Sequence, residues 1–374
     1  MTFEKRAFGE FASFRYGKMP NKNRISDNGK YPIFSGYRIT GYYDEYNLEE
    51  NELVIVARGV GGTGNVKLSP AICYLTNLSI AVEMNEEIAL KKYLYYYFAI
   101  RNLRYLDSGS AQSQITISDL EKVVIPIPDM EEQKKIVAVL SSIDEKIKQN
   151  TAINENLEQQ AQAYFIDLFI TNANPDWKIG TISDLGNVVG GGTPSKKVDE
   201  YYTSSGIAWI TPKDLSNDKS KFVAHGATDI TELGLAKSSA TLMPKGTVLF
   251  SSRAPIGYIA IADGQVSTNQ GFKSIVPFDN VGTAFIYYFL KENLTAIENV
   301  ASGSTFKEVS GSTLKNFGTV IPDNEILAEF QHFCTPLFEQ QQTLEYESRY
   351  LANLRDTLLP KLMNGEIVVS EVKI

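Results

Sequence analysis

An internal repeat constrains the fold of this 374-residue chain more than any other feature. The stretch SGSAQSQITISDLEKVVIPIPD, which begins at Ser108, returns as SGSTFKEVSGSTLKNFGTVIPD, which begins at Ser302, at an offset of 194 residues. Upstream, Thr76-Asn77 recurs as Thr268-Asn269, and near the start of the chain the offset is only 174. Such an ordered series of matches predicts two copies of one structural unit. The second copy carries extra residues in its early loops.

Each copy ends at Pro-Asp and is followed by a long segment with heptad spacing. In both segments seam positions recur at alternating steps of four and three, which predicts two long helices. The seam contains Ile136, Leu140, Ile143, Ile147, Asn150, Asn154 and Leu157 in the first helix, and Leu337, Leu344, Leu351 and Leu358 in the second. At about 1.5 Å per residue, about forty residues make a rod about 60 Å long.

Matched seams within one chain favour two helices that pack against each other. We expect an antiparallel coiled coil whose register is set by polar residues near its middle. These polar residues are Asn150, Asn154, Gln341 and Ser348. The alternative is that each helix packs on its own domain or on another subunit.

The region before each helix is rich in β-branched and aromatic residues with frequent glycines, as in ELVIVARG and GTVLFSSR. This composition is typical of strands joined by loops. The sequence therefore predicts an α+β fold, with two mixed α/β domains separated by two long helices and related by a pseudo-twofold repeat. The predicted divisions are a domain over 1–128, a helix over 129–172, a second domain over 173–322, and a second helix with a tail over 323–374.

Residue types that begin and end helices stand at the expected positions. Asp129 is a natural N-cap, and Glu132 three residues later would complete a capping box. Pro360 is expected to kink the last turns of the second helix, and Asn364-Gly365 to end it. The apolar tail EIVVSEVKI is expected to pack near the first domain.

The net charge is −8, but the acidity belongs to the helical segments. Residues 1–128 contain 15 Lys or Arg against 14 Asp or Glu, and residues 173–322 contain 13 of each. Between Glu10 and Asp27 there are four cations and no acid. Such a cluster is common on a solvated face, and it is also what a phosphate-contacting edge requires.

Catalytic and metal-binding patterns are missing from the sequence. Two cysteines and two histidines are too few for a disulfide framework, a zinc centre or a His-based triad. RGVGGTG matches GxGxxG, but no helix start follows it, and PDMEEQK lacks the spacing of a nuclease motif. No apolar run has the length of a signal peptide or a membrane span. The sequence predicts a binding protein of the cytoplasm, with no membrane partner.

Four motifs carry a resemblance to a known family. They are LRDTLLPKLMNGEI at the C-terminus, IPIPDMEEQKKIVAVLSSIDEKI in the centre, GGGTPSK at Gly190, and WITPKDL at Trp209. With the order domain, helix, domain, helix, the chain resembles the DNA-specificity (S) subunit of type I restriction–modification systems over essentially its whole length. The first copy departs from the pattern, because it reads YGKMPNK where the second reads GGGTPSK.

The resemblance implies a role in reading double-stranded DNA. Each domain would read one half of a bipartite, asymmetric site, while the helices set the spacer and dock two methyltransferase (M) subunits. Nuclease-translocase (R) subunits would complete the restriction enzyme. The subunit itself would be non-catalytic and hold no cofactor, because S-adenosylmethionine, ATP and Mg belong to its partners. A cytoplasmic location in a bacterium or archaeon is expected.

Candidate DNA contacts are loop cations and amides. The phosphate candidates are Lys18, Lys22 and Arg24 in the first copy and Lys196, Lys197 and Lys213 in the second. Arg58 and Arg253 follow equivalent strands and suit bidentate contacts to guanine. The adenine candidates are Gln112, Gln114, Asn269 and Gln270. For each residue the alternative is an ordinary exposed loop position. For the chain, the alternatives are a coiled-coil adaptor for other proteins and a stand-alone methyltransferase or nuclease.

Overall fold

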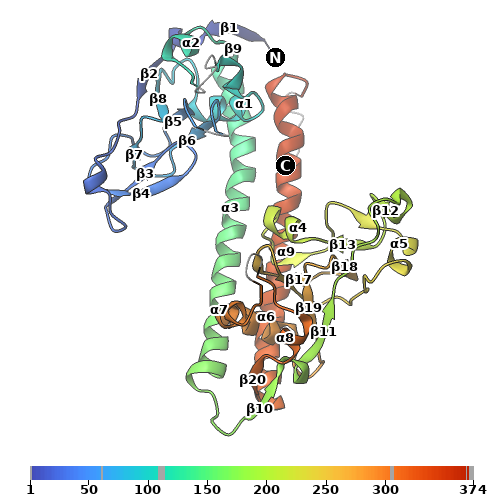
Figure 1. Ribbon diagram of the computed structural model, residues 1–374. Helices are drawn as coiled ribbons and strands as arrows, with labels where there is room; N and C mark the ends of the chain where they lie inside the picture. The colour runs from blue at the N-terminus through green and yellow to red at the C-terminus, as the bar shows by residue number, and fades with distance from the viewer. Residues whose placement is uncertain (1, 60–61, 108–113, 304–306, 368, 370–374) are drawn as a thin grey trace. The chain divides into compact units, whose positions relative to one another are not determined.

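The computed structural model describes residues 2–59, 62–107, 114–303, 307–367 and 369. The chain forms two compact units (Figure 1). Unit 1 comprises Met1–Ile147 together with Tyr350–Ile374, and unit 2 comprises Lys148–Arg349. Each unit therefore contains one strand-rich domain and a part of both long helices.

Unit 1 contains three small sheets. Their orders are β2-β8-β5-β6, β4-β3-β7 and the antiparallel pair β1-β9. The strands are β1 (Phe3–Ala7), β2 (Ala12–Tyr16), β3 (Tyr31–Phe34), β4 (Ile39–Tyr43), β5 (Leu53–Val56), β6 (Val66–Leu68), β7 (Tyr74–Leu75), β8 (Ser79–Met84) and β9 (Val124–Pro128). The short helices are α1 (Lys91–Ala99) and α2 (Ile117–Glu121).

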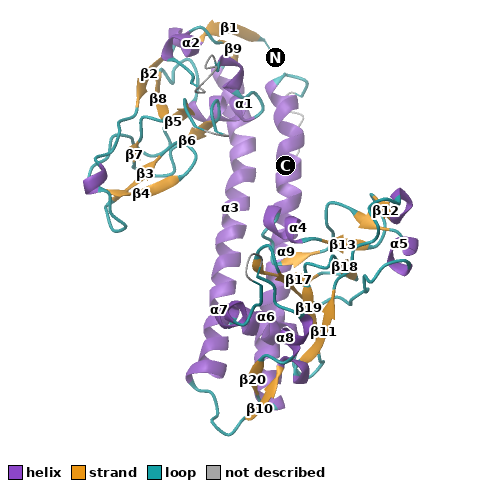
Figure 2. Ribbon diagram, viewed as in Figure 1, coloured by secondary structure: helices purple, strands orange, loops and turns teal. Residues whose placement is uncertain are grey.

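Unit 2 contains a five-stranded sheet of order β11-β19-β16-β17-β14 and the pairs β10-β20, β12-β15 and β13-β18. The strands are β10 (Lys178–Thr181), β11 (Gly186–Gly190), β12 (Tyr202–Thr203), β13 (Ala208–Ile210), β14 (Phe222–Val223), β15 (Asp229–Ile230), β16 (Val248–Ser252), β17 (Ile256–Ala262), β18 (Val266–Thr268), β19 (Lys273–Pro277) and β20 (Gly318–Ile321). The short helices are α4 (Pro212–Asn217), α5 (Glu232–Ala236), α6 (Thr283–Glu292), α7 (Leu294–Asn299) and α8 (Gly311–Lys315). Figure 2 shows these strands in orange and the short helices in purple.

The predicted internal repeat is confirmed by strand pairing. The order β2-β8-β5-β6 in unit 1 corresponds to β11-β19-β16-β17 in unit 2. In each unit one pair of strands is parallel at the equivalent place, β3 with β7 and β13 with β18. Because parallel strands carry their following loops at the same edge, each unit brings two distant loops together there.

The two long helices are α3 (Met130–Ile166) and α9 (Asn324–Met363). Asp129 caps α3, because its Oδ1 accepts a hydrogen bond from the backbone N–H of Glu132 at 2.9 Å. After α9, Gly365 has a φ of 72°, and its N–H donates to the carbonyl of Leu362 while that of Glu366 donates to Lys361. This is a Schellman ending, so the predicted stop is confirmed, and the helix continues through Pro360 to reach it.

Within unit 2 the two helices pair in antiparallel fashion, as predicted. Asn150 Nδ2 donates to Ser348 Oγ at 3.3 Å, and Asn154 Nδ2 donates to the carbonyl of Gln341 at 3.4 Å. Gln341 Nε2 returns a hydrogen bond to the carbonyl of Asn154 at 3.1 Å. Asn150 and Gln341 are buried, so the polar residues of the seam bond to one another.

Within unit 1 the helix ends pack on the domain core. The buried seam residues Ile136 and Leu140 join the same hydrophobic cluster as Leu362. Leu359, at 5% exposure, is more buried than the half-buried Leu358 that the heptads predict at the seam. A straight α-helix drifts by about 20° per heptad from an ideal 3.5-residue repeat, so over several heptads the buried face moves to a neighbouring position.

The apolar tail packs on the core of unit 1. Ile367 and Val369 lie against the cluster that contains Phe8 and Tyr93. The predicted return of the tail to the first domain is therefore confirmed for Ile367 and Val369, and residues 368 and 370–374 lie outside the described residues. The four predicted divisions stay a prediction: the helices begin close to the expected limits, whereas the compact units divide both helices between them.

Among the other seam residues the structure places six in buried or half-buried positions. Ile143, Leu157 and Leu344 are buried. Ile147, Leu337 and Leu351 are half-buried.

Candidate nucleic-acid interface

In unit 2, the loops after the parallel strands β13 and β18 lie side by side. The backbone N–H of Asn269 donates to the carbonyl of Ile210 at 3.0 Å, which extends the pairing into the loops. Asn269 Oδ1 accepts from the N–H of Gly271 at 2.8 Å and so shapes its own turn. Lys213 is exposed on α4, directly after the other strand. The motifs WITPKDL and STNQGFK therefore meet at one edge.

The glycine-rich loop GGGTPSK packs against the same turn. The N–H of Gly192 donates to the carbonyl of Thr268 at 2.8 Å, and its carbonyl accepts from Trp209 Nε1 at 2.9 Å. A Cβ on Gly191 would lie 1.8 Å from the carbonyl oxygen of Asn269, so only glycine permits this approach. Thr193 Oγ1 also meets Gln270 Oε1. The loop thus reaches the candidate Gln270 directly.

Arg253 joins this group from the end of β16. The preceding Ser252 donates its N–H to the carbonyl of Gly271 at 2.8 Å, which ties the loops together. The Arg253 guanidinium Nη1 lies 3.4 Å from Glu308 Oε2. Lys273 Nζ lies 3.6 Å from Glu308 Oε1. The structure therefore brings Arg253, Asn269 and Gln270 into one loop cluster.

The lysine candidates of unit 2 present free charge to solvent. Lys196, Lys197 and Lys213 are exposed, and none forms an ion pair within 4.0 Å with another residue that the structure describes. Cations of this kind suit a flexible polyanion, because their side chains are not committed elsewhere.

Unit 1 builds the same arrangement from different side chains. The N–H of Thr76 donates to the carbonyl of Phe34 at 3.0 Å, as Asn269 does to Ile210 in the other unit. Thr76 therefore takes the place of Asn269, one position away from the sequence match with Thr268. Lys18 donates its N–H to the carbonyl of Leu75 at 3.0 Å, and a Cβ on the adjacent glycine, Gly17, would lie 2.2 Å from the Thr76 carbonyl oxygen. Lys18 is exposed. The sequence YGKMPNK thus occupies the place of GGGTPSK despite its different composition.

Arg58 and Gln114 are neighbours in unit 1. They form an isolated antiparallel bridge, and the same bridge joins Arg253 to Glu308 in unit 2. The Arg58 guanidinium lies 5.8 Å from the centre of the Tyr16 ring. Gln112, the other amide candidate of this loop, falls outside the described residues.

Lys22 and Arg24 lie in a short 3-10 helix, Lys22–Arg24, capped by Asn21. Both side chains are exposed. Arg24 Nη2 pairs with Glu45 Oε1 at 2.8 Å, and the guanidinium lies 4.9 Å from the Tyr43 ring. Arg24 is therefore already engaged, whereas Lys22 has no ion-pair partner among the described residues.

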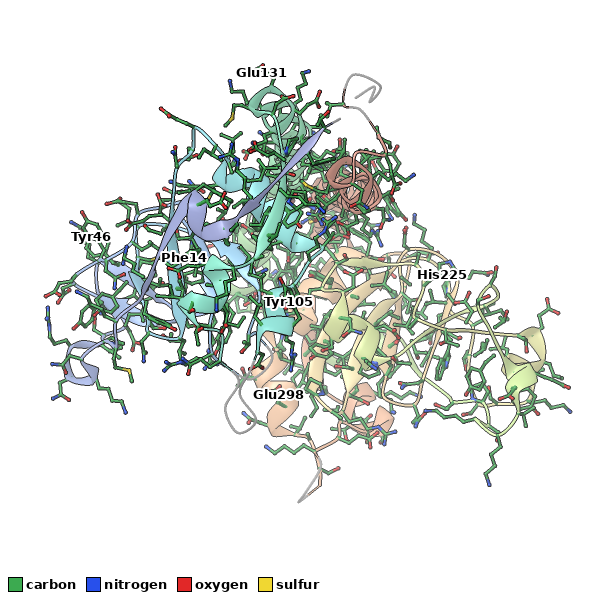
Figure 3. The ribbon with its side chains drawn as sticks, turned by 90° about the horizontal axis from the view of Figure 1, so that it is seen from above. Phe14, Tyr46, Tyr105, Glu131, His225 and Glu298 are labelled. Atoms are coloured by element: carbon green, nitrogen blue, oxygen red, sulfur yellow. The ribbon has the colours of Figure 1, made fainter. Side chains whose placement is uncertain are left out.

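Sequence reasoning missed the turn after β3, where Tyr37 and Arg38 stand. Tyr37 is 41% exposed and its ring lies beside the Arg58 loop, since a Cβ on Gly62 would be 3.4 Å from it. Arg38 lies 5.5 Å from the Tyr37 ring. This turn corresponds to the turn of unit 2 that carries Lys213. An alignment of β3 with β13, the equivalent parallel strands of the two copies, would have identified it. Tyr46, also exposed, lies at the outer edge of unit 1 (Figure 3).

A buried charged network ties the domain of unit 2 to the helices. Lys221, which precedes β14, donates to Glu158 Oε2 of α3 at 2.7 Å and to Gln341 Oε1 of α9 at 2.9 Å. Lys291 of α6 donates to Glu158 Oε1 at 2.6 Å. Tyr288 OH donates to Glu158 Oε2 at 2.9 Å. Three helices and one loop thus share a single carboxylate.

Burial and neighbouring charges shift the pKa values of both Glu158 and Lys221. Burial raises the pKa of Glu158, but Lys221 and Lys291 outweigh that effect and lower it to about 2. Burial lowers the pKa of Lys221 to about 8, although Glu158 opposes the shift. Between these two values both groups are ionised. The Lys221 side chain, 7% exposed, also lies 3.6 Å from the centre of the Phe338 ring.

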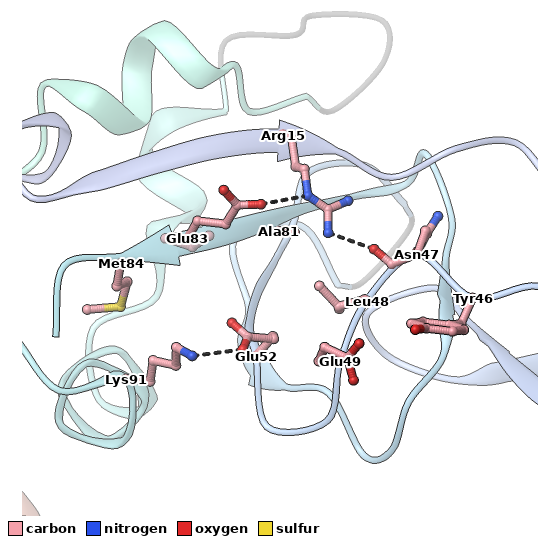
Figure 4. Close-up of a pocket in the computed structure, with 11 residues that line it drawn as sticks. Arg15, Tyr46, Asn47, Leu48, Glu49, Glu52, Ala81, Glu83, Met84 and Lys91 are labelled. Carbon is pink, nitrogen blue, oxygen red and sulfur yellow. Dashed lines mark hydrogen bonds and ion pairs between the residues drawn. The ribbon is translucent and has the colours of Figure 1, made fainter.

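A cavity of about 460 Å³ opens on unit 1 (Figure 4). Four of the five charged side chains that line it are paired with one another, and Glu49 is the fifth. Arg15 contacts Glu83 at 3.0 Å and the carbonyl of Asn47 at 2.6 Å, and Lys91 contacts Glu52 at 2.7 Å. We assign no ligand to this cavity.

Among the described residues, no arrangement of side chains supports a metal site or a His-based catalytic triad. They contain no group of three or more His, Cys, Asp or Glu side chains that is placed to hold a metal ion. His225 is exposed on unit 2 (Figure 3), and its Nδ1 lies 3.3 Å from Asp229 Oδ1. Cys73 and Cys334 are buried and unpaired, and burial raises the pKa of Cys334 to about 12. Within the described ranges, no helix is both long and apolar enough to cross a bilayer.

Comparisons with known proteins agree with this architecture. The family described as "Type I restriction modification DNA specificity domain" matches residues 1–159 and 174–355, one match for each copy of the repeat. The HindI specificity subunit of Haemophilus influenzae is 25% identical over 369 residues, covering 77% of this chain and 80% of that one. The MjaIX specificity subunit of Methanocaldococcus jannaschii is 44% identical over 152 residues, which span 40% of this chain and only 35% of that one.

A solved structure has the same fold. The crystal structure of a type I restriction–modification system S subunit from M. genitalium superposes with a TM-score of 0.69 at 19% identity, covering 97% of this chain and 96% of that one. The paired matches of the family and this fold define a two-domain specificity architecture. The chain belongs to the family of type I restriction–modification DNA specificity subunits, which are the non-catalytic members of those systems.

Proposed function

We propose that each unit reads one half of a bipartite, asymmetric DNA sequence through the loops at the edge of its parallel strands. The observation that carries this proposal is the equivalent loop cluster of the two units, each with an arginine after the homologous strand. Both clusters add exposed lysines. Arginine and amide side chains read base edges, while lysines contact phosphates.

The candidate residues differ in whether hydrogen bonds fix the backbone at their position. Arg58 and Arg253 have fixed backbones and are proposed to contact guanine; Gln114, Asn269 and Gln270 are proposed to contact adenine. Lys18, Lys22, Lys196, Lys197 and Lys213 are proposed phosphate contacts. Arg24 is a weaker candidate than its neighbours because Glu45 already holds its guanidinium.

We assign the long helices two tasks, setting the spacer between the half-sites and docking two M subunits. α3 has 37 residues and is about 55 Å long at about 1.5 Å per residue, which exceeds the 34–36 Å between half-sites one turn of DNA apart. R subunits would complete the nuclease, and S-adenosylmethionine, ATP and Mg would stay with the partners. These subunits operate in the cytoplasm of a bacterium or archaeon.

The charge of the chain supports a separation of DNA affinity, supplied largely by the M subunits, from specificity, supplied by this chain. The chain carries a net charge of −8, and its domains are close to neutral, so it releases few counterions when it contacts DNA. Much of the affinity for DNA would therefore come from the M subunits, and the specificity from this chain.

Methylome sequencing of cells with and without the gene tests the proposal, provided that the cognate M subunit is present. We expect one bipartite motif, with two half-sites and a fixed spacer, that disappears with the gene. Methylation that is unchanged without the gene contradicts a role in recognition, and a motif without a gap contradicts two separate readers.

Matched insertions test the spacer. Seven residues added after Asn150 and seven after Glu347 lengthen both helices by one heptad and preserve the seam. About 10 Å of added helix corresponds to about 3 base pairs of spacer at 3.4 Å each. We expect both half-sites to be unchanged and the spacer to grow; an unchanged spacer refutes the proposed ruler. Insertion in one helix alone is the control, because it breaks the pairing of Asn150 with Ser348.

A further inference from the structure

Glu308 is an acid inside a loop cluster that is otherwise rich in cations and amides. It stands in unit 2 where Gln114 stands in unit 1, since each forms the bridge with the arginine that follows the homologous strand. An acid at this place weakens attraction to phosphate. It is therefore a poor choice for DNA affinity and needs another explanation.

The backbone of Glu308 is fixed from two sides. Its N–H donates to the carbonyl of Ser302 at 2.8 Å, and its carbonyl accepts from the N–H of Ser302 at 3.0 Å. The next residue, Val309, donates its N–H to the carbonyl of Ser252 at 3.0 Å. The carboxylate is consequently held at a defined distance from the end of β16.

The two carboxylate oxygens of Glu308 engage two cations. Oε2 lies 3.4 Å from Nη1 of Arg253, and Oε1 lies 3.6 Å from Nζ of Lys273. The Lys273 side chain is 17% exposed, whereas Arg253 is 38% exposed and keeps donors available to a ligand. A guanidinium has five N–H donors in a rigid fork, so one contact to a carboxylate leaves a second edge free.

We propose that Glu308 is a specificity-determining positioning residue that orients the Arg253 guanidinium toward one base and withholds it from phosphates. The inference rests on the proposed function, because it assumes that this loop cluster faces DNA. A guanine contact through O6 and N7 requires the plane of the guanidinium to be set, which an arginine free to rotate does not provide. Unit 1 has the neutral Gln114 at the same place, so its Arg58 lacks this restraint.

Glu308→Gln in the full-length chain, assembled with its M subunit, tests the inference. Methylation rates are measured on the cognate duplex and on duplexes with single base-pair substitutions, and binding to a non-cognate duplex is measured across salt concentrations. We expect discrimination at one position of the second half-site to fall by about tenfold, with the first half-site unchanged. Non-cognate binding should tighten, and its dependence on salt should steepen by about one released counterion, because Arg253 becomes free to contact phosphate, whereas Lys273 still donates to the carbonyls of Gln270 and Phe272.

This combination separates positioning from a merely structural role. A damaged loop would weaken cognate and non-cognate binding together, and that outcome overturns the inference, as does an unchanged motif. Glu308→Asp keeps the charge and should preserve discrimination at the affected position. Glu4→Gln, which removes the partner of Arg6 on β1, is the matched charge control and should leave the motif unchanged.

A failure of the proposed function would give a different experimental result from a failure of this inference alone. A wild-type complex that methylates no bipartite sequence refutes the reading role of both units, and this inference with it. A normal wild-type motif that Glu308→Gln leaves intact refutes only the inference. The reciprocal variant Gln114→Glu should sharpen discrimination at the position assigned to Arg58 in the first half-site, and it should lose the adenine contact proposed for the Gln114 amide.

Discussion

Replacing Lys221 by methionine should destabilise unit 2 by about 3 kcal/mol. The methionine fills similar space but leaves Glu158, whose side chain is 21% exposed, with only Lys291 as a charged partner. Removing one partner of a buried ion pair costs about 3–5 kcal/mol, and the remaining contact to Lys291 favours the lower end. The pKa of Glu158 supports the direction of this effect, because Lys221 and Lys291 together lower it to about 2 against the opposing effect of burial, and the Lys221→Met variant loses the first of these two partners.

The two tryptophans make this effect measurable in the intact chain. Trp177 and Trp209 are the only tryptophans of the sequence, and both are buried in unit 2. Tryptophan fluorescence during urea unfolding therefore reports unit 2 and not unit 1. With a slope of about 3 kcal/mol per molar urea, the Lys221→Met midpoint should fall by about 1 M.

A double variant separates charge from packing. Lys221→Met combined with Glu158→Leu removes both charges of the Lys221–Glu158 pair and leaves only Lys291, which is 30% exposed, without its ion-pair partner; because replacing a buried pair by apolar groups is often neutral or stabilising, part of the stability should return. Arg355→Met is the control: Arg355 pairs with Asp144 at 2.8 Å in unit 1, where both side chains are about one-third exposed. The Arg355→Met variant should change the free energy of unfolding by no more than about 1 kcal/mol, and it should leave the midpoint of the fluorescence transition unchanged. A Lys221→Met midpoint within about 0.3 M of wild type, or losses that simply add in the double variant, refutes the reasoning.

Three other changes have defined outcomes. Because the pKa of Glu158 is depressed, its contribution is complete above pH 4.5 and is lost as the pH falls toward about 2; the stability difference between wild type and Glu158→Gln, measured by urea unfolding, should shrink over that range. Gly191→Ala should destabilise unit 2 by about 2 kcal/mol in the fluorescence assay, because its Cβ would lie 1.8 Å from a backbone oxygen, while Gly190→Ala, with nothing within 4 Å, should not suffer this clash. Ending the chain at Asn364 removes the packing of Ile367 and should speed hydrogen exchange in unit 1 by about tenfold, leaving the tryptophan transition unchanged.

The sequence predicted the long helices and the repeat because both depend on local spacing. Asp129 caps α3 and Gly365 ends α9, and each of these signals lies within a few residues of the boundary that it sets. The seam was predicted well where polar residues specify it, at Asn150 and Gln341. The seam prediction was wrong at Leu358, because Leu359 is the more buried of the two. The drift of a straight helix from the heptad repeat accumulates over several turns, so no single heptad reveals it.

The contacts that fasten each domain to its helices could not be predicted. Lys221 lies in the stretch DKSKF, which reads as a solvated turn, and its partners come from three other parts of the chain. Only the tertiary fold reveals that Glu158 accepts from Lys221, Lys291 and Tyr288 together. Charge pairs that are far apart in sequence have no periodicity, so spacing rules do not detect them.

The differences between the two copies bear on how a repeated protein reads an asymmetric site. Two identical readers related by a twofold axis would recognise two identical half-sites, as symmetric dimers do on palindromic DNA. Here the backbone pairing is kept, since Arg58 with Gln114 and Arg253 with Glu308 form the same bridge, while one partner changes from a neutral amide to an acid. Side-chain differences on a shared backbone alter base preference without altering where each reader sits. On the proposed function, exchanging residue 114 for glutamate and residue 308 for glutamine should therefore move discrimination between the half-sites and leave the spacer constant.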